Sequence, residues 1–425
     1  MRIAIITAHS PLARAGHRTG RLDPVALVDP ASLVDPVALA RGLAGLGHRV
    51  TLYARTEDAA APRTAILGAG VSVEHISVGP ARELTAEHAA KYMPEMAVAL
   101  ADRWRAKSPD VVHAFSWTAG LAAIGAVRGT SIPVVQTFGS LASIERRQAR
   151  SGVSAARIRL EGSMGRTVAT VLAASQEEAA ELSRLGVPRS VIRAIPAGVD
   201  TTVFCPPDVR AGAGSSARLV AVADDQARGL QSVIRALPHL PAAELTIAGG
   251  PDARHMPRSG PFRELVQLAT TLRVRDRVTF AGELADADLA ELLRTADVMV
   301  SATAYAPAGQ AVVQAMACGI PVVASAVGGQ RDAVVDGITG LLVAPDRPAM
   351  LVQRLRALLA RPAMLQAYGI AAADRARSRY AIDRVSRETA AAYDRCLRTS
   401  AADVISEDES DEAEDLRDAQ ALAFA

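Results

Sequence analysis

Two series of short, β-rich apolar runs constrain the fold of this chain more than any other feature. In each series the apolar runs alternate with stretches of helical periodicity, which is typical of a parallel sheet with crossover helices. The first series comprises residues 3–6, 50–53, 71–78, 110–114, 133–137 and 170–173, and the second comprises residues 219–223, 244–248, 277–280, 298–301 and 321–324. The pattern predicts an α/β protein with two sheets.

The length of the chain indicates two domains, because 425 residues exceed what one hydrophobic core usually supports. The segment that separates the two series is rich in proline, glycine and serine, as linkers are. We expect an N-terminal Rossmann-like domain over residues 1–200, a linker over 201–216, a C-terminal Rossmann-like domain over 217–380, a C-terminal helix over 381–400 that packs back towards the N-terminal domain, and an acidic disordered tail over 401–425. Ligands of such sheets sit at the carboxyl ends of the strands, which predicts a site in the cleft between the domains.

The formal net charge of +2 hides an acidic C-terminus. From Thr399 onwards nine acidic residues stand against Arg417 alone, so this stretch carries −8 and the rest of the chain carries +10. A basic body suits an anionic ligand or an anionic membrane face, and an ordinary solvated surface is the alternative. We expect the tail to be a solubilising end, and the alternatives are that it binds a basic partner or screens the protein's own basic cleft. Nucleic-acid binding is not indicated, because no basic stripe interleaved with aromatic residues occurs.

The sequence does not indicate a metal-binding, a disulfide-rich or a membrane-spanning protein. Cys205, Cys318 and Cys396 lie far apart without a paired Cys or His, so neither a zinc site nor a disulfide framework is implied. The first apolar run is too short for a signal peptide, and no apolar stretch reaches the ~20 residues of a membrane span. We expect a cytoplasmic protein, with peripheral contact at the inner membrane face left open.

Two helix starts can be predicted from local sequence. Three near-copies of a six-residue Asp-Pro unit follow one another from Leu22 onwards. In the last copy, Asp35 suits an N-cap and Pro36 suits a first helical position. Ser175 and Glu178 have the spacing of a capping box. They are expected to open a helix that ends near Leu185.

Two glycine-rich segments carry a family resemblance. Residues 315–329 and 332–343 closely resemble the nucleotide-sugar-binding segment of retaining glycosyltransferases of family 4, of an actinobacterial type. Supporting matches are residues 195–200, 248–251, 110–113 and 116–120. The resemblance spans nearly the whole chain before the acidic tail. It implies the GT-B fold, in which two Rossmann-like domains face each other across a cleft, and a nucleoside diphosphate sugar as donor substrate, with no cofactor and no metal ion.

The resemblance also implies a donor site in the C-terminal half. Gly309 would lead into a helix through Met316 whose free N–H groups and positive dipole end suit a diphosphate. The alternative is that Gly309 only permits close packing of this helix. The expected diphosphate-binding residues are Arg228, Gly229, Gly309 and Gln310, and the expected nucleotide- and ribose-binding residues are Gln314, Gly249 and Gly250.

Several charged positions of the family are substituted here. The family has two glutamates eight positions apart, and this chain has Ala306 and Gln314 instead. Gln314 can still hydrogen-bond a ribose hydroxyl, whereas Ala306 has no polar side-chain atom. An Arg–Lys pair of the family corresponds to Ala223 and Arg228, which leaves one cation. Losing one preorganised charge at a developing anion costs on the order of 100- to 1000-fold in rate.

The N-terminal, acceptor-side half departs from the family too. Residues 9–14 and the Asp-Pro copies replace a glycine-rich loop, and Gly139 stands where related bacterial members have a histidine. Of a family His-x-His pair only His113 remains, since Phe115 takes the second place. His113 is the candidate catalytic residue, in contact with the hexose, and a satisfied core histidine is the alternative.

Two functions therefore stay open. The first is a family 4-type transferase that moves a hexosyl group to an unidentified glycan, lipid or small-molecule acceptor, with weakened activity. The second is a catalytically inactive relative that binds a nucleotide, a glycan or an active paralogue as a regulatory subunit. The completeness of the resemblance favours the first. An epimerase of the same fold is disfavoured because its cleft carboxylates have no counterpart, and a dinucleotide oxidoreductase because no GxGxxG follows residues 3–6.

Overall fold

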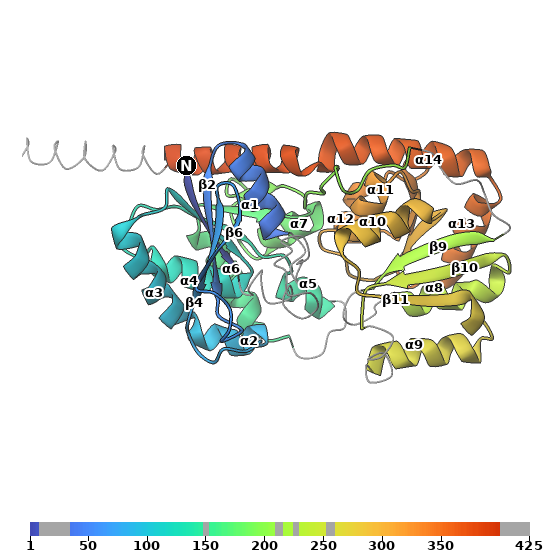
Figure 1. Cartoon of the computed structure of the whole chain (residues 1–425), viewed down its shortest axis with the longest axis horizontal. Helices are drawn as coiled ribbons and strands as arrows, with labels where there is room; N and C mark the ends of the chain where they lie inside the picture. The colour runs from blue at the N-terminus through green and yellow to red at the C-terminus, as the bar shows by residue number, and fades with distance from the viewer. Residues whose placement is uncertain (8–34, 148–152, 209–215, 224–228, 252–259, 400–425) are drawn as a thin grey trace, which may run out of the picture.

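The computed structural model describes residues 1–7, 35–147, 153–208, 216–223, 229–251 and 260–399. Two α/β units lie side by side along the long axis of the molecule (Figure 1). Each unit has a mainly parallel sheet with helices on both faces, which confirms the predicted fold class of two Rossmann-like domains.

The N-terminal sheet has the strand order β3-β4-β2-β1-β5-β6-β7-β8. All neighbours pair in parallel except β3 and β4. The strands are β1 (Arg2–Thr7), β2 (Arg49–Arg55), β3 (Thr64–Gly68), β4 (Val71–Ile76), β5 (Val111–Phe115), β6 (Val134–Thr137), β7 (Thr170–Ala173) and β8 (Ile192–Ala194). The helices are α1 (Pro36–Gly45), α2 (Ala86–Ala89), α3 (Met93–Ala106), α4 (Trp117–Ala126), α5 (Ala142–Arg147), α6 (Ala155–Thr167) and α7 (Gln176–Arg184). The sequence analysis missed the edge strands β3 and β8, which are short and partly exposed.

The C-terminal sheet has the strand order β11-β10-β9-β12-β13-β14, and every pair in it is parallel. The strands are β9 (Ala217–Val222), β10 (Ala243–Ala248), β11 (Val278–Gly282), β12 (Val298–Ser301), β13 (Val322–Ser325) and β14 (Gly340–Val343). The helices are α8 (Leu230–Ala236), α9 (Gly260–Thr271), α10 (Asp286–Thr295), α11 (Gln310–Ala317), α12 (Gly328–Ala333), α13 (Pro348–Leu359) and α14 (Pro362–Arg375), which continues as a π-helical turn over Ala376–Tyr380.

The apolar runs are continuous rather than alternating because both faces of each sheet are covered. In β1, Ile3 and Ile5 belong to the core on one face, whereas Ala4 and Ile6 belong to the core on the other. Side chains of a strand alternate between faces, so each run supplies two cores. The C-terminal sheet has the same arrangement of two flanking cores.

Both predicted helix starts are confirmed. Asp35 Oδ1 accepts hydrogen bonds from Val37 N–H at 2.8 Å and Ala38 N–H at 3.1 Å. Glu178 N–H donates to Ser175 Oγ at 3.2 Å. The Glu178 carboxylate reaches back to the N–H of Ala174, at 2.7 Å. Asp35 and Ser175 thus satisfy N–H groups that the first turn of a helix leaves without partners.

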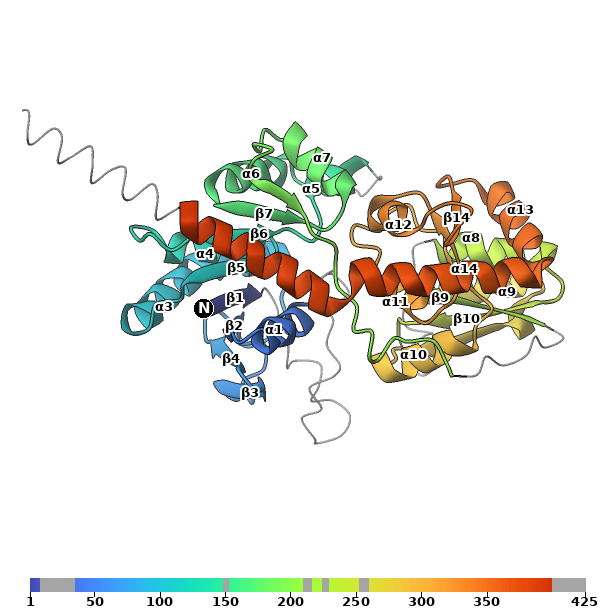
Figure 2. The ribbon, with the colours of Figure 1, turned by 90° about the horizontal axis from the view of Figure 1, so that it is seen from above.

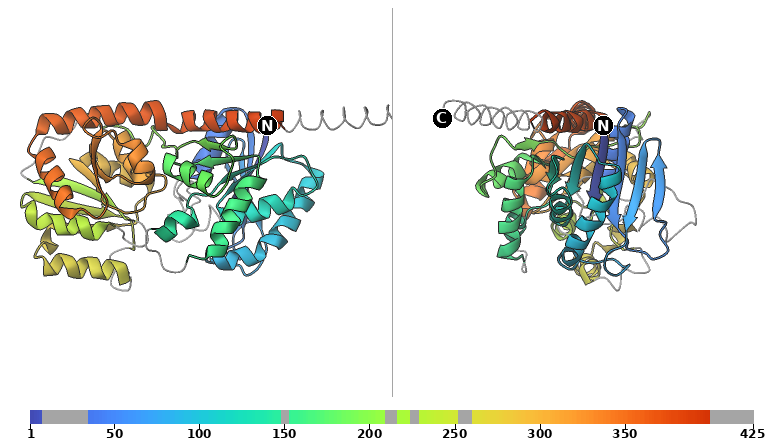
Figure 3. Two further views of the ribbon diagram at one scale, coloured as in Figure 1. Left: turned by 180° about the vertical axis from the view of Figure 1, so that it is seen from behind. Right: turned by 90° about the vertical axis from the view of Figure 1, so that its left-hand side faces the viewer.

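The chain passes from one unit to the other twice, near residue 199 and near residue 381, and the two crossing segments lie side by side. The N–H of Val199 donates to the Tyr380 carbonyl at 2.8 Å, and the N–H of Ile382 donates to the Val199 carbonyl at 2.9 Å. After this crossing a helix over residues 382–399 runs along the N-terminal sheet (Figures 2 and 3). Ala390, Tyr393 and Cys396 of this helix belong to the same core as Ile3 and Ile5.

Some predicted features lie outside the described residues: residues 9–14, the Asp-Pro copies before residue 35, Arg228 and the tail from residue 400. Among the helices that the structure describes, none is long and apolar enough to cross a bilayer.

Candidate functional site

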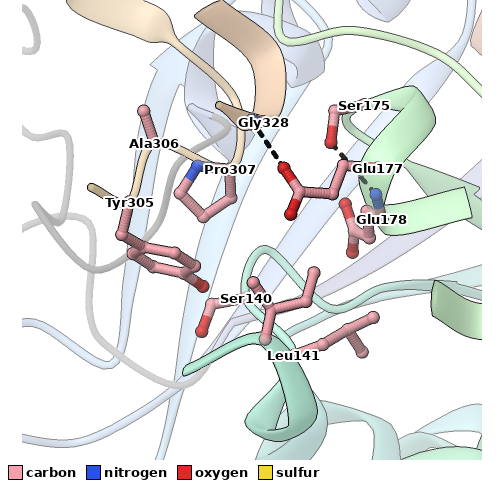
Figure 4. A pocket seen from close by; sticks show the side chains of 10 residues that line it. Ser140, Leu141, Ser175, Glu177, Glu178, Tyr305, Ala306, Pro307 and Gly328 are labelled. Carbon is pink, nitrogen blue, oxygen red and sulfur yellow. Dashed lines mark hydrogen bonds between the residues drawn. The ribbon is translucent and has the colours of Figure 1, made fainter. Parts of the chain in front are cut away.

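A pocket lies between the two units, at the carboxyl ends of β6, β7, β12 and β13 (Figure 4). Its wall in the N-terminal unit consists of Ser140, Leu141, Ile144, Ser175, Glu177 and Glu178, and its wall in the C-terminal unit consists of Tyr305, Ala306, Pro307 and Gly328. This is where open α/β sheets place their ligands.

Two hydrogen bonds join the units beside this pocket. The N–H of Gly328, the first residue of α12, donates to Glu177 Oε2 at 2.7 Å. In the opposite direction, the N–H of Gln176, the first residue of α7, donates to Asp332 Oδ2 at 2.7 Å. Each helix start therefore binds a carboxylate from the other unit. A negative charge is favourable at a helix N-terminus, because that end of the helix dipole is positive.

The turn before α11 packs backbone against backbone on the start of α12. The N–H of Gly329 donates to the carbonyls of Ala306 and Pro307, both at 2.9 Å. Gly309 has a φ of 67°, and a Cβ there would lie 2.7 Å from the nitrogen of Gln330. A glycine is required on both counts. Gly309 thus permits close packing, as the alternative interpretation held, and it also leaves the start of α11 without a side-chain cap.

The two glutamines of α11 differ in their surroundings. Gln310 donates from Nε2 to the carbonyl of Gly198 at 3.0 Å, which ties this helix to the first interdomain crossing. Its Oε1 is buried without a hydrogen-bond partner among the described residues. Gln314 lies one turn further on and is 7% exposed.

The other predicted donor-site glycines gather at the carboxyl ends of β9, β10 and β12. Gly229 and Gly249 have φ angles of 77° and 87°. A Cβ on Gly229 would lie 2.5 Å from the nitrogen of Thr303, and a Cβ on Gly250 would lie 2.0 Å from the ring of Phe262. Ala223 follows β9, and its N–H donates to the carbonyl of Ala248 at 2.8 Å. Close packing, against backbone at Gly229 and Gly249 and against the ring of Phe262 at Gly250, accounts for these glycines by itself.

His113 lies in the interior of the N-terminal unit, on β5, and is 1% exposed. Its Nδ1 is hydrogen-bonded to the hydroxyl of Tyr393 at 2.6 Å and its Nε2 to Thr137 Oγ1 at 2.9 Å. Burial lowers the pKa of His113 to about 3, so the imidazole is neutral. With both ring nitrogens engaged, the geometry supports the alternative of a satisfied core histidine rather than contact with a hexose. Gly139 lies nearby in sequence with a φ of 74°.

A stability measurement checks the state of His113. We expect its contribution to stability to fall as the pH drops below 6.5, because the unfolded histidine then binds a proton that the folded one accepts only near pH 3. At about 1.36 kcal/mol per pH unit, roughly 2 kcal/mol is lost between pH 6.5 and pH 5. Urea unfolding of the wild type and His113→Gln at pH 8, 6.5 and 5 measures this as a pH-dependent difference. A difference that stays constant would contradict a neutral, buried imidazole.

The sequence analysis missed a group of buried glutamates beside the pocket. Glu161 and Glu178 are 0% and 1% exposed, and burial raises the pKa of each to about 7. Arg157 donates to Glu161 at 2.8 Å and to Glu145 at 3.2 Å. The available signal was the spacing of Glu178 and Glu181 three residues apart, on the inward face of α7. Among the residues that the structure describes, no group of three or more His, Cys, Asp or Glu side chains could hold a metal ion.

Comparison with known proteins matches both halves of the chain. The model "Glycosyltransferase Family 4" matches residues 37–203, and "Glycosyl transferases group 1" matches residues 219–375. A D-inositol 3-phosphate glycosyltransferase of Xylanimonas cellulosilytica is 31% identical over 381 residues, which cover 84% of this chain and 88% of the relative. The protein of that name from Streptomyces bingchenggensis is 28% identical over 421 residues, covering 93% and 90%.

Solved structures have the same fold. Sucrose-phosphate synthase from Thermosynechococcus elongatus has a TM-score of 0.81 at 24% identity, covering 94% of this chain and 99% of its own. HepE from Anabaena, solved in complex with UDP and glucose, has a TM-score of 0.70 at 18% identity, covering 91% and 98%.

Proposed function

The chain belongs to the family 4 glycosyltransferases of the GT-B fold, and from this premise we propose that it transfers a hexosyl group from a nucleoside diphosphate sugar to an acceptor. The acceptor is a glycan, a lipid or a small molecule, and the transfer needs no metal ion. The structure of HepE, which has this fold, was solved in complex with UDP and glucose, and this supports a donor of this kind.

The observation that carries the proposal is the start of α11. Its first-turn N–H groups have no side-chain cap, and the left-handed Gly309 holds the turn before it against α12. Uncapped N–H groups and the positive end of a helix dipole favour a diphosphate. We place the diphosphate at Gly309 and Gln310, and we assign Gly229 and, from the family resemblance, Arg228 to the same group.

The remaining assignments follow from position. Gln314 is assigned to the ribose through its amide, and Gly249 and Gly250 to the nucleotide at the end of β10. His113 is assigned to the core rather than to chemistry, because both its ring nitrogens are engaged.

A catalytically inactive partner subunit is the second candidate function. The observation that favours it is Ala306, whose methyl group lines the pocket where the family resemblance implies a carboxylate. Ala223 likewise replaces a cation after β9. A chain that binds a nucleotide or a glycan without turnover would match this candidate.

Calorimetric titration with UDP, GDP, ADP and their glucose or mannose conjugates tests the donor site. We expect the wild type to bind one nucleotide, and Gly309→Ala to bind it at least about 10-fold more weakly, a difference of about 1.4 kcal/mol. The reason is that a Cβ at residue 309 would force the start of α11 away from residues 329 and 330.

Gly337→Ala is the matched control for this experiment. Gly337 has a similar φ of 76°, but a Cβ there would have no atom within 4 Å, so the control should bind like the wild type. If both variants bound the nucleotide equally well, the assignment of the diphosphate to Gly309 would be wrong. No heat with any nucleotide, from a folded wild type, would contradict the proposed function.

A further inference from the structure

Only one of the two carboxylate oxygens of Glu178 has a hydrogen-bond partner among the described residues. Its Oε2 accepts a hydrogen bond from the N–H of Ala174, the residue before the N-cap Ser175 of α7, at 2.7 Å. Its Oε1 is buried and has no hydrogen-bond partner among the described residues. A buried acceptor without a partner costs about 1–3 kcal/mol. The bond to Ala174 explains one oxygen of this carboxylate and leaves the other without a structural purpose.

Glu178 lines the interdomain pocket, on the wall opposite Tyr305 and Ala306 (Figure 4). The neighbouring carboxylate, Glu177, is already engaged: its Oε2 accepts from Gly328, and its Oε1 lies 3.9 Å from Arg147. The hydroxyl of Ser175 accepts from the N–H of Glu178 itself. Of these groups on the α7 wall, Glu178 Oε1 is the buried acceptor that has neither a hydrogen bond nor an ion pair among the described residues.

The charges around the pocket select the kind of group that can bind there. Arg157 is paired with Glu145 and Glu161, and Arg147 is paired with Glu181. These two arginines are therefore paired with other carboxylates, and a phosphate would meet the negative charge of Glu177. A hydroxyl group suits the position, because it donates to an ionised carboxylate. Burial raises the pKa of Glu178 to about 7, so the contact is tested at pH 8, where the ionised form predominates.

We propose that Glu178 Oε1 binds a hydroxyl group of the hexosyl unit, and that it selects the sugar of the donor. The proposal rests on the proposed function, since it names a contact in the same cleft. It assigns to the N-terminal unit a part in recognising a donor that the C-terminal unit otherwise holds. Glu178 is a binding residue here and takes no part in bond making.

Glu178→Gln tests the contact. The buried N–H of Ala174 keeps its acceptor only if the glutamine points its carbonyl oxygen towards it, which turns the amide NH2 towards the pocket. The variant thus exchanges a charged acceptor for a neutral donor. Hydrogen bonds to charged groups contribute about 1.5–3 kcal/mol, so the affinity ratio of sugar nucleotide to free nucleotide should fall about 10- to 100-fold. Binding of the free nucleotide should stay within about two-fold, since the nucleotide does not reach Glu178.

Glu181→Gln is the matched control. It removes a carboxylate that is 4% exposed from the same helix, one turn further on, and Glu181 is not among the residues that line the pocket. The control should leave the ratio unchanged. If both variants weaken sugar nucleotide and free nucleotide alike, the role of Glu178 is structural and the proposal is overturned.

Deoxy and fluoro analogues of the donor sugar identify the hydroxyl. One analogue should bind more weakly to the wild type and show no further loss with Glu178→Gln, because residue and hydroxyl form one interaction. If every analogue loses affinity equally in both proteins, the proposal is overturned. If Glu178→Gln does not fold, Ala306→Leu fills the pocket from the opposite wall without touching the capping box, and should lower the same ratio.

These outcomes separate the two proposals. A wild type that binds no nucleotide refutes the proposed function. A wild type that gains affinity from the sugar, with an unchanged ratio in Glu178→Gln and in Ala306→Leu, refutes only the assignment of Glu178.

Discussion

Tyr393→Ala is expected to lower the free energy of unfolding by about 3–5 kcal/mol, the usual cost of deleting a buried aromatic side chain. Tyr393 is 0% exposed and lies in the core of the N-terminal unit. Its hydroxyl is hydrogen-bonded to Nδ1 of the buried His113 at 2.6 Å. The substitution therefore leaves a cavity and also a buried ring nitrogen without its partner.

Tryptophan fluorescence during urea unfolding measures this effect in the right unit, because the two tryptophans of the chain, Trp104 and Trp117, both lie in the N-terminal core. Tyr393→Phe removes the hydroxyl alone and should cost about 1–3 kcal/mol. Arg395→Ala, at an exposed position on the same helix, should stay within about 0.5 kcal/mol of the wild type. If Tyr393→Ala were as stable as Arg395→Ala, the docking of helix 382–399 would be wrong.

The second prediction concerns activity. The combined variant Ala223→Arg, Ala306→Glu and Gln314→Glu is expected to raise the rate of sugar transfer or donor hydrolysis by about 100-fold or more. One preorganised charge at a developing anion contributes on the order of 100- to 1000-fold, and the backbone that would hold these side chains is already packed around Gly309 and Gly329. Release of the nucleoside diphosphate measures the rate.

The control for this variant carries Gln instead of Glu at residue 306, which matches the size without the charge. The assay belongs near pH 8, because a carboxylate at residue 306 would share the pocket with Glu177 and Glu178, and like charges raise one another's pKa. Donor binding without any gain in turnover would contradict this prediction and favour the inactive partner subunit.

The fold was predictable because its signals are local. Apolar runs buried on both faces, the cap at Asp35 and the capping box at Ser175 each occupy a few consecutive residues. The glycines of the cleft were equally visible, since a left-handed φ or a close backbone contact demands that residue type. Local patterns of this kind predict structure without any knowledge of tertiary contacts.

The chemistry of the pocket was not predictable because it depends on burial. Glu178 follows Gln176 and Glu177 in a polar stretch, and such a stretch usually faces solvent. Here it lines the interdomain pocket together with Leu141 and Gly328, and burial then raises the pKa of its carboxyl. The two interpretations of His113 could not be separated for the same reason, since its partner Tyr393 lies 280 residues away in sequence.

The return of the chain to its first unit has a consequence for synthesis on the ribosome. Domains usually complete their folding in the order in which they are translated. In this protein Ala390, Tyr393 and Cys396 pack in the same core as Ile3 and Ile5 of β1. The sheet that leaves the ribosome first therefore keeps part of this apolar face uncovered until the entire second unit has been translated, although α1 covers another part earlier. A nascent chain of this protein is a candidate for chaperone binding at its N-terminal half, and the half made first is the last to be finished.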